Sequence, residues 1–251
     1  MNRSEAKPPR SMPATPTATG CLQGVRVVDL TQVIAGPYCA MQLAQLGAQV
    51  LRLEALSGDP LRWRGGSSAA LAAQGLSTHY QAHAAGRTQV MYLDWTQPEG
   101  VEQLCSQLAQ ADVFVCNLRA HVLPAMGLDD ETLAAHYPQL VSCFISGYSA
   151  LHDAAPCADW PAYDNTVQAA SGLMRLSGAA PAGARVGAPV LDYATGMAAL
   201  SGVLAALLER QRSGRGQVVR VNMLAVAHQL MTAQRTDIAL TNQEPAFKGN
   251  R

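Results

Sequence analysis

The stretch that decides the fold is LQGVRVVDLTQVIAGPYCAMQLAQLGAQVLRLE, residues 22–54. Within it, VRVVDL (25–30) is short, β-branched and almost continuously apolar, which is typical of a strand buried on both faces of a parallel sheet. A turn, TQVIAGPYCA (31–40), leads into MQLAQLGA (41–48), whose apolar residues recur at helical spacing, and AQVLRLE (48–54) predicts the next strand. A strand, a turn, a helix and a strand within about 30 residues indicate a right-handed crossover and a Rossmann-like parallel sheet.

The same alternation continues along the chain. Further strands are predicted in VMYLDW (90–95), DVFVCNL (112–118), LVSCFISGYS (140–149) and the start of QVVRVNMLAVAHQLMTAQR (217–235). Helices are predicted in 96–110, 121–140, 162–178, 190–216 (after a brief strand end) and the remainder of 217–235. The segment 56–88 has weak periodicity and predicts a long surface excursion with one short helix. The fold class is therefore α/β, with a Rossmann-like parallel sheet flanked by helices.

Composition narrows the class of ligand. Charged residues make up 14% of the chain, against roughly 25% in typical soluble domains, which predicts that a partner chain covers part of the surface. The 18 basic and 18 acidic residues give no net charge, so a small ligand is favoured over nucleic acid or an anionic membrane.

The longest apolar run, 194–208, is too short to span a bilayer. The six cysteines lack metal-site spacing, so we expect reduced, mostly buried thiols, with neither a metal nor disulfides.

We expect three segments of different character. Residues 1–20 carry charge, Pro, Thr and Ser without the apolar centre of a signal peptide, and they predict a disordered leader and a cytoplasmic protein. Residues 21–224 form the predicted Rossmann-like domain. Residues 225–251 predict a helical segment and the start of a connection to a second domain that this chain lacks.

Asp192 in VLDYATGM (190–197) is the strongest candidate for chemistry. We expect it where a strand gives way to a helix, and there the free N–H groups and the helix dipole stabilise an anion. An ionised Asp192 would be available as a nucleophile or a base. The commoner role of Asp before a helix is to cap it, and the residues alone leave both interpretations open.

Several further segments occur in a recognisable order after 22–54. They are GDPLR (58–62), ADVFVCNLR (111–119), MGLDDETL (126–133), AYDNTVQAASGLM (162–174) and APVLDYATGMAALSGVLAALLERQRSGRGQVVRVNML (188–224). Together they resemble the class III coenzyme A (CoA) transferases of the CaiB/BaiF type, which include formyl-CoA transferase, carnitine CoA-transferase and the α-methylacyl-CoA racemases. The resemblance spans nearly everything after the leader. It implies the large domain of that fold without most of its small domain.

The resemblance implies a covalent mechanism at Asp192. Transferases of this family use an Asp at this position to attack an acyl-CoA thioester, giving an acyl-aspartyl anhydride and then an aspartyl-CoA thioester from which a carboxylic acid takes over CoA. One carboxylate that accepts and returns acyl groups of similar energy divides a difficult exchange into easier steps. Because these intermediates hydrolyse, the site must exclude water and offer donors to the oxyanion.

The racemases of the family are a third interpretation. They place a His before an Asp at positions that correspond to Tyr163 and Asp164. A tyrosine hydroxyl, with an ordinary pKa of about 10, is a poor proton-shuttling base near neutral pH, so a transferase is favoured over an acyl-CoA racemase or epimerase. Without the resemblance, Tyr163 and Asp164 are equally compatible with a helix start and with the wall of an acyl pocket.

The resemblance also implies where CoA binds. The implied residues are Val33, Ile34, Ala35, Arg52, Leu93, Asn117, Leu118, Arg119 and Met126. The chain departs from the family pattern where cations are expected, because Ala55 and Ala125 stand at those positions. Four arginines either supply the missing positive charge or are ordinary surface residues: Arg52, Arg62, Arg87 and Arg119.

Partners follow from the same resemblance. Family chains continue into a smaller domain and form interlocked dimers, so we expect acyl-CoA, a carboxylic acid and a related chain in a homo- or hetero-dimer as partners. The chain is then a fragment or a short subunit. The rival to an enzyme is a non-catalytic or assembly subunit that pairs with an active homologue, which Ala55 and Ala125 favour and Asp192 opposes. A nicotinamide dehydrogenase is excluded because AGPYCAMQLAQLG (35–47) lacks G-x-G-x-x-G.

Overall fold

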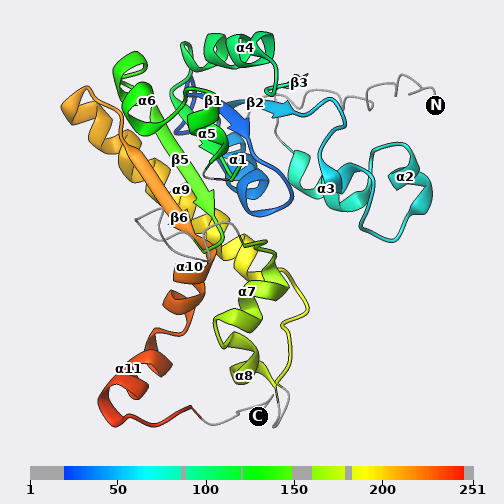
Figure 1. Ribbon diagram of the computed structural model, residues 1–251, viewed down its shortest axis with the longest axis vertical. Coiled ribbons are helices and arrows are strands. Elements are labelled where there is room, and N and C mark those ends of the chain that lie inside the picture. Colours follow the sequence, from blue (N-terminus) through cyan, green and yellow to red (C-terminus); the bar gives the residue numbers. More distant parts are fainter. Residues whose placement is uncertain (1–19, 86–88, 120, 149–159, 179–182, 246–251) are drawn as a thin grey trace.

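The protein is built on a single parallel sheet (Figure 1). The computed structural model describes residues 20–245, apart from 86–88, 120, 149–159 and 179–182. The strands are β1 (Arg26–Leu30), β2 (Gln49–Glu54), β3 (Gln89–Tyr92), β4 (Val113–Cys116), β5 (Val141–Ser146) and β6 (Val218–Asn222). Their order is β3-β2-β1-β4-β5-β6, and every neighbouring pair is parallel. This confirms the predicted α/β class and the Rossmann-like sheet.

The sheet is covered on both faces, which explains its continuous apolar strands. The helices are α1 (Ala35–Gln45), α4 (Pro98–Leu108), α5 (Val122–Ala125), α6 (Asp130–His136) and α9 (Val190–Ser213). Side chains alternate along β1, so that Val27 joins the core beneath α1 and α9, whereas Val28 joins the core beneath α4. Of the described cysteines, Cys39, Cys116 and Cys143 are buried in these cores.

α1 and α9 pack closely against each other, and a glycine allows the approach. A Cβ atom on Gly196 would lie 2.6 Å from the carbonyl oxygen of Ala35. With 24 residues, α9 is long and apolar enough to cross a membrane by length and composition alone. One of its faces, which includes Ala199 and Val203, is buried in the core beside β5 and β6, so its apolar character is that of a core helix.

The excursion after β2 is more regular than expected. Instead of one short helix it contains a 3-10 turn, Pro60–Arg62, and the helices α2 (Ala69–Ala73) and α3 (Thr78–Ala84). Ser68 and Ser77 begin the two helices, because each hydroxyl accepts a backbone N–H in the first turn. α3 packs against α1 and against the 3-10 turn, and so covers the side of the turn after β1.

A second group of helices lies beyond the carboxyl ends of β5 and β6 (Figure 1). It consists of α7 (Asp164–Ala170), α8 (Leu173–Ser177), α10 (Met223–Leu230) and α11 (Thr232–Thr241). α10 packs on α7 and α9 and buries Val226 and Ala227. The expected domain boundary after residue 224 therefore falls inside a packed helix. The predicted leader lies almost entirely outside the described residues.

Several expected boundaries are wrong for identifiable reasons. α1 begins at Ala35, so the turn after β1 is shorter than 31–40. The single helix expected in 121–140 is two, because Gly127 has a φ of 66° and Asp129 caps a new helix through the Thr132 N–H. The helix expected over 162–178 divides at Gly172, whose φ is 84°. The described residues directly before α9, 183–189, form no strand, and the helix begins at Val190 after Pro189.

Candidate functional site

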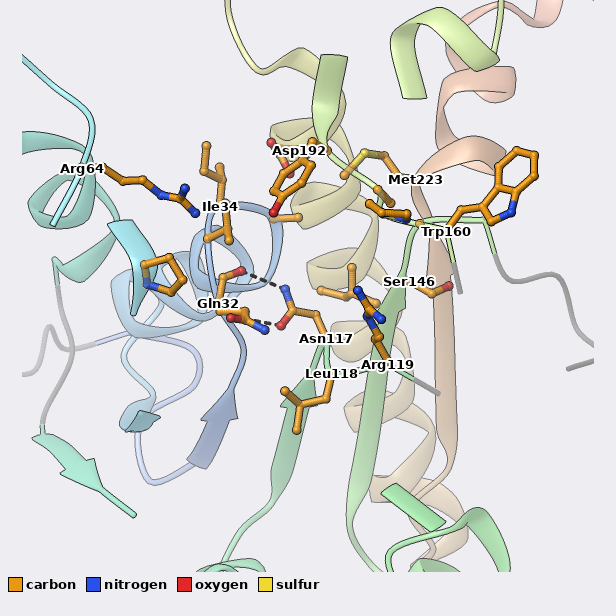
Figure 2. Close-up of a pocket in the computed structure, with 18 residues that line it drawn as sticks. Gln32, Ile34, Arg64, Asn117, Leu118, Arg119, Ser146, Trp160, Asp192 and Met223 are labelled. Carbon is orange, nitrogen blue, oxygen red and sulfur yellow. Dashed lines mark hydrogen bonds between the residues drawn. The ribbon is translucent and has the colours of Figure 1, made fainter. Parts of the chain in front are cut away.

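A cavity of about 260 Å³ opens at the carboxyl edge of the sheet (Figure 2). It lies where the chain leaves β1, β4 and β5, beside the N-terminal turn of α9. The strand order reverses between β1 and β4, and in open parallel sheets the crevice at this reversal is the usual place for a ligand. Its walls combine polar groups with apolar ones such as Ile34, Trp160 and Met223.

Asp192 lines this cavity as the third residue of α9. The residue is only 8% exposed. Burial and, after it, the charge of Asp164 raise the pKa of Asp192, a hydrogen bond from the Ala35 backbone N–H opposes both, and the resulting pKa is about 7. The expectation of a fully ionised Asp192 is therefore corrected. It is also not the helix cap, because Pro189 holds that position.

The cap of α9 comes from Asp164, which lies on α7. Asp164 Oδ2 accepts the backbone N–H groups of Leu191 at 2.7 Å and of Asp192 at 3.4 Å. Gln168 Nε2 donates to the other carboxylate oxygen at 2.5 Å. Asp164 is buried and lies behind the cavity wall, whereas Tyr163 beside it is 52% exposed and lines the cavity. The two residues expected at the acyl pocket are thus separated.

The turn after β1 joins the two central strands at the cavity floor. The Gln32 backbone N–H donates to Asn117 Oδ1 at 2.9 Å, and Asn117 Nδ2 donates back to the Gln32 carbonyl at 2.8 Å, as Figure 2 shows. Val33 has a φ of 69°, a conformation that is rare for a β-branched residue. Its N–H donates to Asp59 Oδ2 at 3.1 Å. The turn that carries Val33, Ile34 and Ala35 is therefore held from both sides.

Arg52 lies beneath this turn and is fully buried, outside the cavity that contains Asp192. It pairs with Asp29 at 2.9 Å and with Asp59 at 2.6 Å. Arg62 is equally buried and pairs with Glu54 at 2.6 Å. Burial acts to raise the pKa of Glu54, but the Arg62 hydrogen bond and the two guanidinium charges outweigh it and lower the pKa. These arginines hold the fold together through buried ion pairs, and Arg52 also lines a smaller hollow beside the cavity, so its role in binding CoA stays a prediction.

The other expected CoA residues are divided between cavity and core. Asn117, Leu118 and Arg119 line the cavity together with the turn after β1. Leu93 is 2% exposed within the core, and Met126 packs against the same cluster. Arg87 lies outside the described residues.

Arg64 is a cavity residue that the sequence reading missed, and it lies on the side of the cavity opposite Arg119 (Figure 2). Both side chains are exposed, and neither has an ion-pair partner within the part of the chain that the structure describes. The signal was a second arginine two residues after Arg62, in GDPLRWR (58–64). Guanidinium groups on two sides make the cavity suited to an anion.

A smaller hollow of about 120 Å³ adjoins the cavity and shares Gln32, Pro60 and Leu118 with it. It extends over the ends of β1 and β2 to Ala55, where a cation was expected. Among the described residues, no group of three or more His, Cys, Asp or Glu is arranged to hold a metal ion. The chemistry available here is that of one buried carboxyl group beside an elongated, partly cationic crevice.

A buried carboxyl at the reversal point of a parallel sheet, with a long crevice beside it, defines a protein suited to act on an extended small-molecule ligand. The chain belongs to CoA-transferase family III, whose model matches residues 22–251. The predicted family is thereby confirmed.

Curated relatives agree with this assignment. A succinate–glutarate CoA-transferase of Agrobacterium fabrum is 32% identical over 234 residues, which cover 91% of this chain and 57% of the relative. An (R)-2-hydroxy-4-methylpentanoate CoA-transferase of Clostridioides difficile is 32% identical over 91% of this chain and 57% of its own length. The alpha subunit of a succinyl-CoA–L-malate CoA-transferase of Chloroflexus aurantiacus is also 32% identical, and 53% of it is covered. The chain thus spans little more than half the length of these relatives.

Solved structures show the same fold. A CaiB/BaiF family protein from Brucella suis matches with a TM-score of 0.82 and 28% identity, over 93% of this chain and 61% of that one. The Rv3272 protein of Mycobacterium tuberculosis matches with a TM-score of 0.79 and 27% identity, over 90% of this chain and 61% of its own.

Proposed function

We propose that the protein transfers CoA between an acyl-CoA thioester and a carboxylic acid, with Asp192 as the covalent nucleophile. The observation that carries this proposal is the position of Asp192, a buried carboxyl group that reaches the cavity at the reversal point of the sheet. Family membership and the transferases among the relatives support the reaction class.

The chemistry requires Asp192 in its ionised form. A carboxylate oxygen attacks the thioester carbonyl carbon and the carbon–sulfur bond breaks. CoA departs as its thiolate, and an acyl-aspartyl anhydride remains. The thiolate then attacks the aspartyl carbonyl, which releases the first acid and forms aspartyl-CoA. The incoming carboxylate attacks aspartyl-CoA and displaces the CoA thiolate, which gives a new acyl-aspartyl anhydride. The thiolate then attacks the acyl carbonyl of this anhydride, so the new acyl-CoA leaves and the Asp192 carboxylate is restored. With a pKa of about 7, a substantial share of Asp192 is ionised at neutral pH.

The ligand is proposed to lie along the crevice. The adjoining hollow, which runs over the ends of β1 and β2, takes part of CoA, and Arg64 and Arg119 attract its phosphates or the substrate carboxylate. The cavity beside Asp192, of about 260 Å³, suits a small acyl group. The named substrates of the relatives, among them succinate, glutarate and malate, are acids of this size.

A related second chain is proposed to complete the site. The cavity is open along the side of Trp160 and Tyr163, which are 60% and 52% exposed. The hydrolysable intermediates need a site closed to water, and a neighbouring chain over these residues would provide the closure. The printed name of the Chloroflexus relative, an alpha subunit, is consistent with such an arrangement.

Trapping with hydroxylamine tests the proposal. Incubation with succinyl-CoA or another acyl-CoA and hydroxylamine should convert Asp192 to a hydroxamate that mass spectrometry locates on its peptide. Asp192→Asn should give no adduct, while Asp237→Asn, an exposed carboxylate on α11, should leave the yield unchanged. Absence of the adduct in the wild-type chain, alone and with a co-purified related chain, would contradict the catalytic role and favour an assembly subunit.

A further inference from the structure

We propose that Asp164 is the positioning residue of this site: its carboxylate caps α9 from a separate helix and so fixes both the place and the charge state of Asp192. The kinetic consequence rests on the proposed function, whereas the structural and electrostatic parts do not. Asp164 itself is not among the residues that line the cavity.

The N-terminus of α9 needs an acceptor from elsewhere. The first N–H groups of a helix have no partner within it, and the capping residue here is Pro189, which offers no side-chain acceptor. Asp164 Oδ2 supplies that acceptor to Leu191 at 2.7 Å and to Asp192 at 3.4 Å. A side-chain cap of this kind stabilises a helix by about 1 kcal/mol. Since Asp192 lies in the capped turn, the cap also fixes its position.

Gln168 clamps Asp164 in this orientation. Its Nε2 donates to Asp164 Oδ1 at 2.5 Å and to the Val186 carbonyl at 3.3 Å, while its Oε1 accepts the Val186 N–H at 2.9 Å. Gln168 is fully buried. The clamp therefore ties α7 to the segment that leads into α9, and both oxygens of Asp164 are engaged.

The same contacts hold the Asp164 carboxylate beside the carboxyl of Asp192. After burial, the charge of Asp164 is the second cause that raises the pKa of Asp192. The charge makes the Asp192 carboxylate more basic, which strengthens it as a nucleophile and reduces its ionised share at neutral pH.

Other groups also face Asp192 from the elements around it. On α9 the next residue is Tyr193, which stacks on His83 of α3 and packs edge-on against Tyr38 of α1. Arg64 and Arg119 line the same cavity. Of these neighbours, Asp164 is the one whose charge raises the pKa of Asp192.

Titration by NMR tests the proposal without requiring activity. In the ¹³C-aspartate-labelled chain, the signal missing in Asp192→Asn identifies Asp192 and should titrate near pH 7. Asp164→Asn should move that midpoint down by at least one pH unit, a tenfold change in the ionisation constant, and should accelerate exchange of the Leu191 amide. Asn165→Ala, an exposed neighbour on α7, should change neither.

Three results would overturn the proposal. One is a folded Asp164→Asn chain in which Asp192 titrates as in the wild type. The other two need no variant: a wild-type Asp192 that titrates near the ordinary value of about 4, and a Leu191 amide that exchanges freely. The hydroxamate yield adds the kinetic readout, because its dependence on pH should shift down with the midpoint in Asp164→Asn. If the wild type forms no hydroxamate, the proposed function fails while the titration still decides the role of Asp164.

Discussion

Arg52 Nη2 lies 2.6 Å from Asp59 Oδ2, and that oxygen also accepts the backbone N–H of Val33 at 3.1 Å. Arg52 donates in addition to Asp29 and to the Thr31 hydroxyl, at 2.9 and 2.8 Å. One buried guanidinium thus connects the ends of β1 and β2 to the turn that lines the cavity. Val33 can keep its strained conformation because this network holds the turn through its backbone N–H.

Replacing Arg52 should therefore be costly for stability. Arg52→Met removes the counter-charge of Asp29, Asp59 and Glu54 while they remain buried, and breaking a buried pair in this way costs about 3–5 kcal/mol. Urea unfolding followed by circular dichroism measures the loss.

The matched control for this prediction is an arginine whose ion pair is exposed. Arg220 pairs with Asp130 at the surface, and Arg220→Met should cost no more than about 1 kcal/mol. Equal losses in the two variants would contradict the structural role of Arg52.

These arginines show where sequence reasoning reached its limit. The alternation of strands and helices, the buried character of β1 and the crevice residues Asn117 and Arg119 follow from local patterns and family motifs. The burial of Arg52 does not, because its partners Asp29 and Asp59 lie on other segments and only the folded sheet brings them together. From the local sequence alone, an arginine at a strand end is therefore a candidate for binding phosphate.

The start of α9 was missed for a similar reason. Val190 and Leu191 have the local character of a strand, and the acceptor that lets the helix begin at Val190 is Asp164, 27 residues before Leu191. A capping signal is readable when it lies within the first turn, as at Ser77. It is invisible when it comes from another helix. The charge state of Asp192 depends on the same distant contact.

Asp192→Asn should stabilise the folded chain at neutral and alkaline pH. The pKa of Asp192 is raised to about 7 in the folded state, so between pH 4 and 7 the folded chain holds a proton that the unfolded chain has lost. The contribution of Asp192 to stability therefore falls as pH rises through this window. Relative to the wild type, the variant should gain up to about 4 kcal/mol at pH 8 and nothing at pH 4.

Chemical denaturation at pH 4, 6 and 8 measures this difference, with Asp237→Asn as the exposed control that should show no such trend. A difference between Asp192→Asn and the wild type that is constant over this range would mean that Asp192 titrates as an ordinary carboxyl. A trend of opposite sign would mean that the folded state favours its anion.

Gly196→Ala should separate α1 from α9. The added Cβ would lie 2.6 Å from the Ala35 carbonyl oxygen and 3.0 Å from Tyr38 Cδ1, and backbone atoms cannot yield cheaply. We expect a loss of about 1–3 kcal/mol in stability and, because the Ala35 N–H holds the Asp192 carboxyl, a reduced hydroxamate yield.

Gly187→Ala is the control for this prediction, since a Cβ there meets nothing within 4 Å. It should leave both stability and adduct formation unchanged. If Gly196→Ala is as stable and as reactive as Gly187→Ala, the close approach of the two helices is not needed to position the nucleophile.

Arg64→Gln and Arg119→Gln should each weaken binding of the acyl-CoA. The two guanidinium groups line the same cavity as Asp192, and a charge-assisted hydrogen bond to an anion contributes about 1.5–3 kcal/mol, so the KM or Kd for acyl-CoA should rise roughly 10-fold or more. Isothermal titration calorimetry with free CoA separates the phosphates from the substrate carboxylate, because only an arginine that binds a phosphate changes the affinity for CoA itself. Binding should also weaken with salt in the wild type and less so in each variant.

Arg212→Gln, at the exposed end of α9, is the control for this prediction. It changes the net charge by the same amount and should bind CoA as the wild type does. An equal loss in Arg212→Gln would show that the effect is one of overall charge and that the cavity holds no anion site.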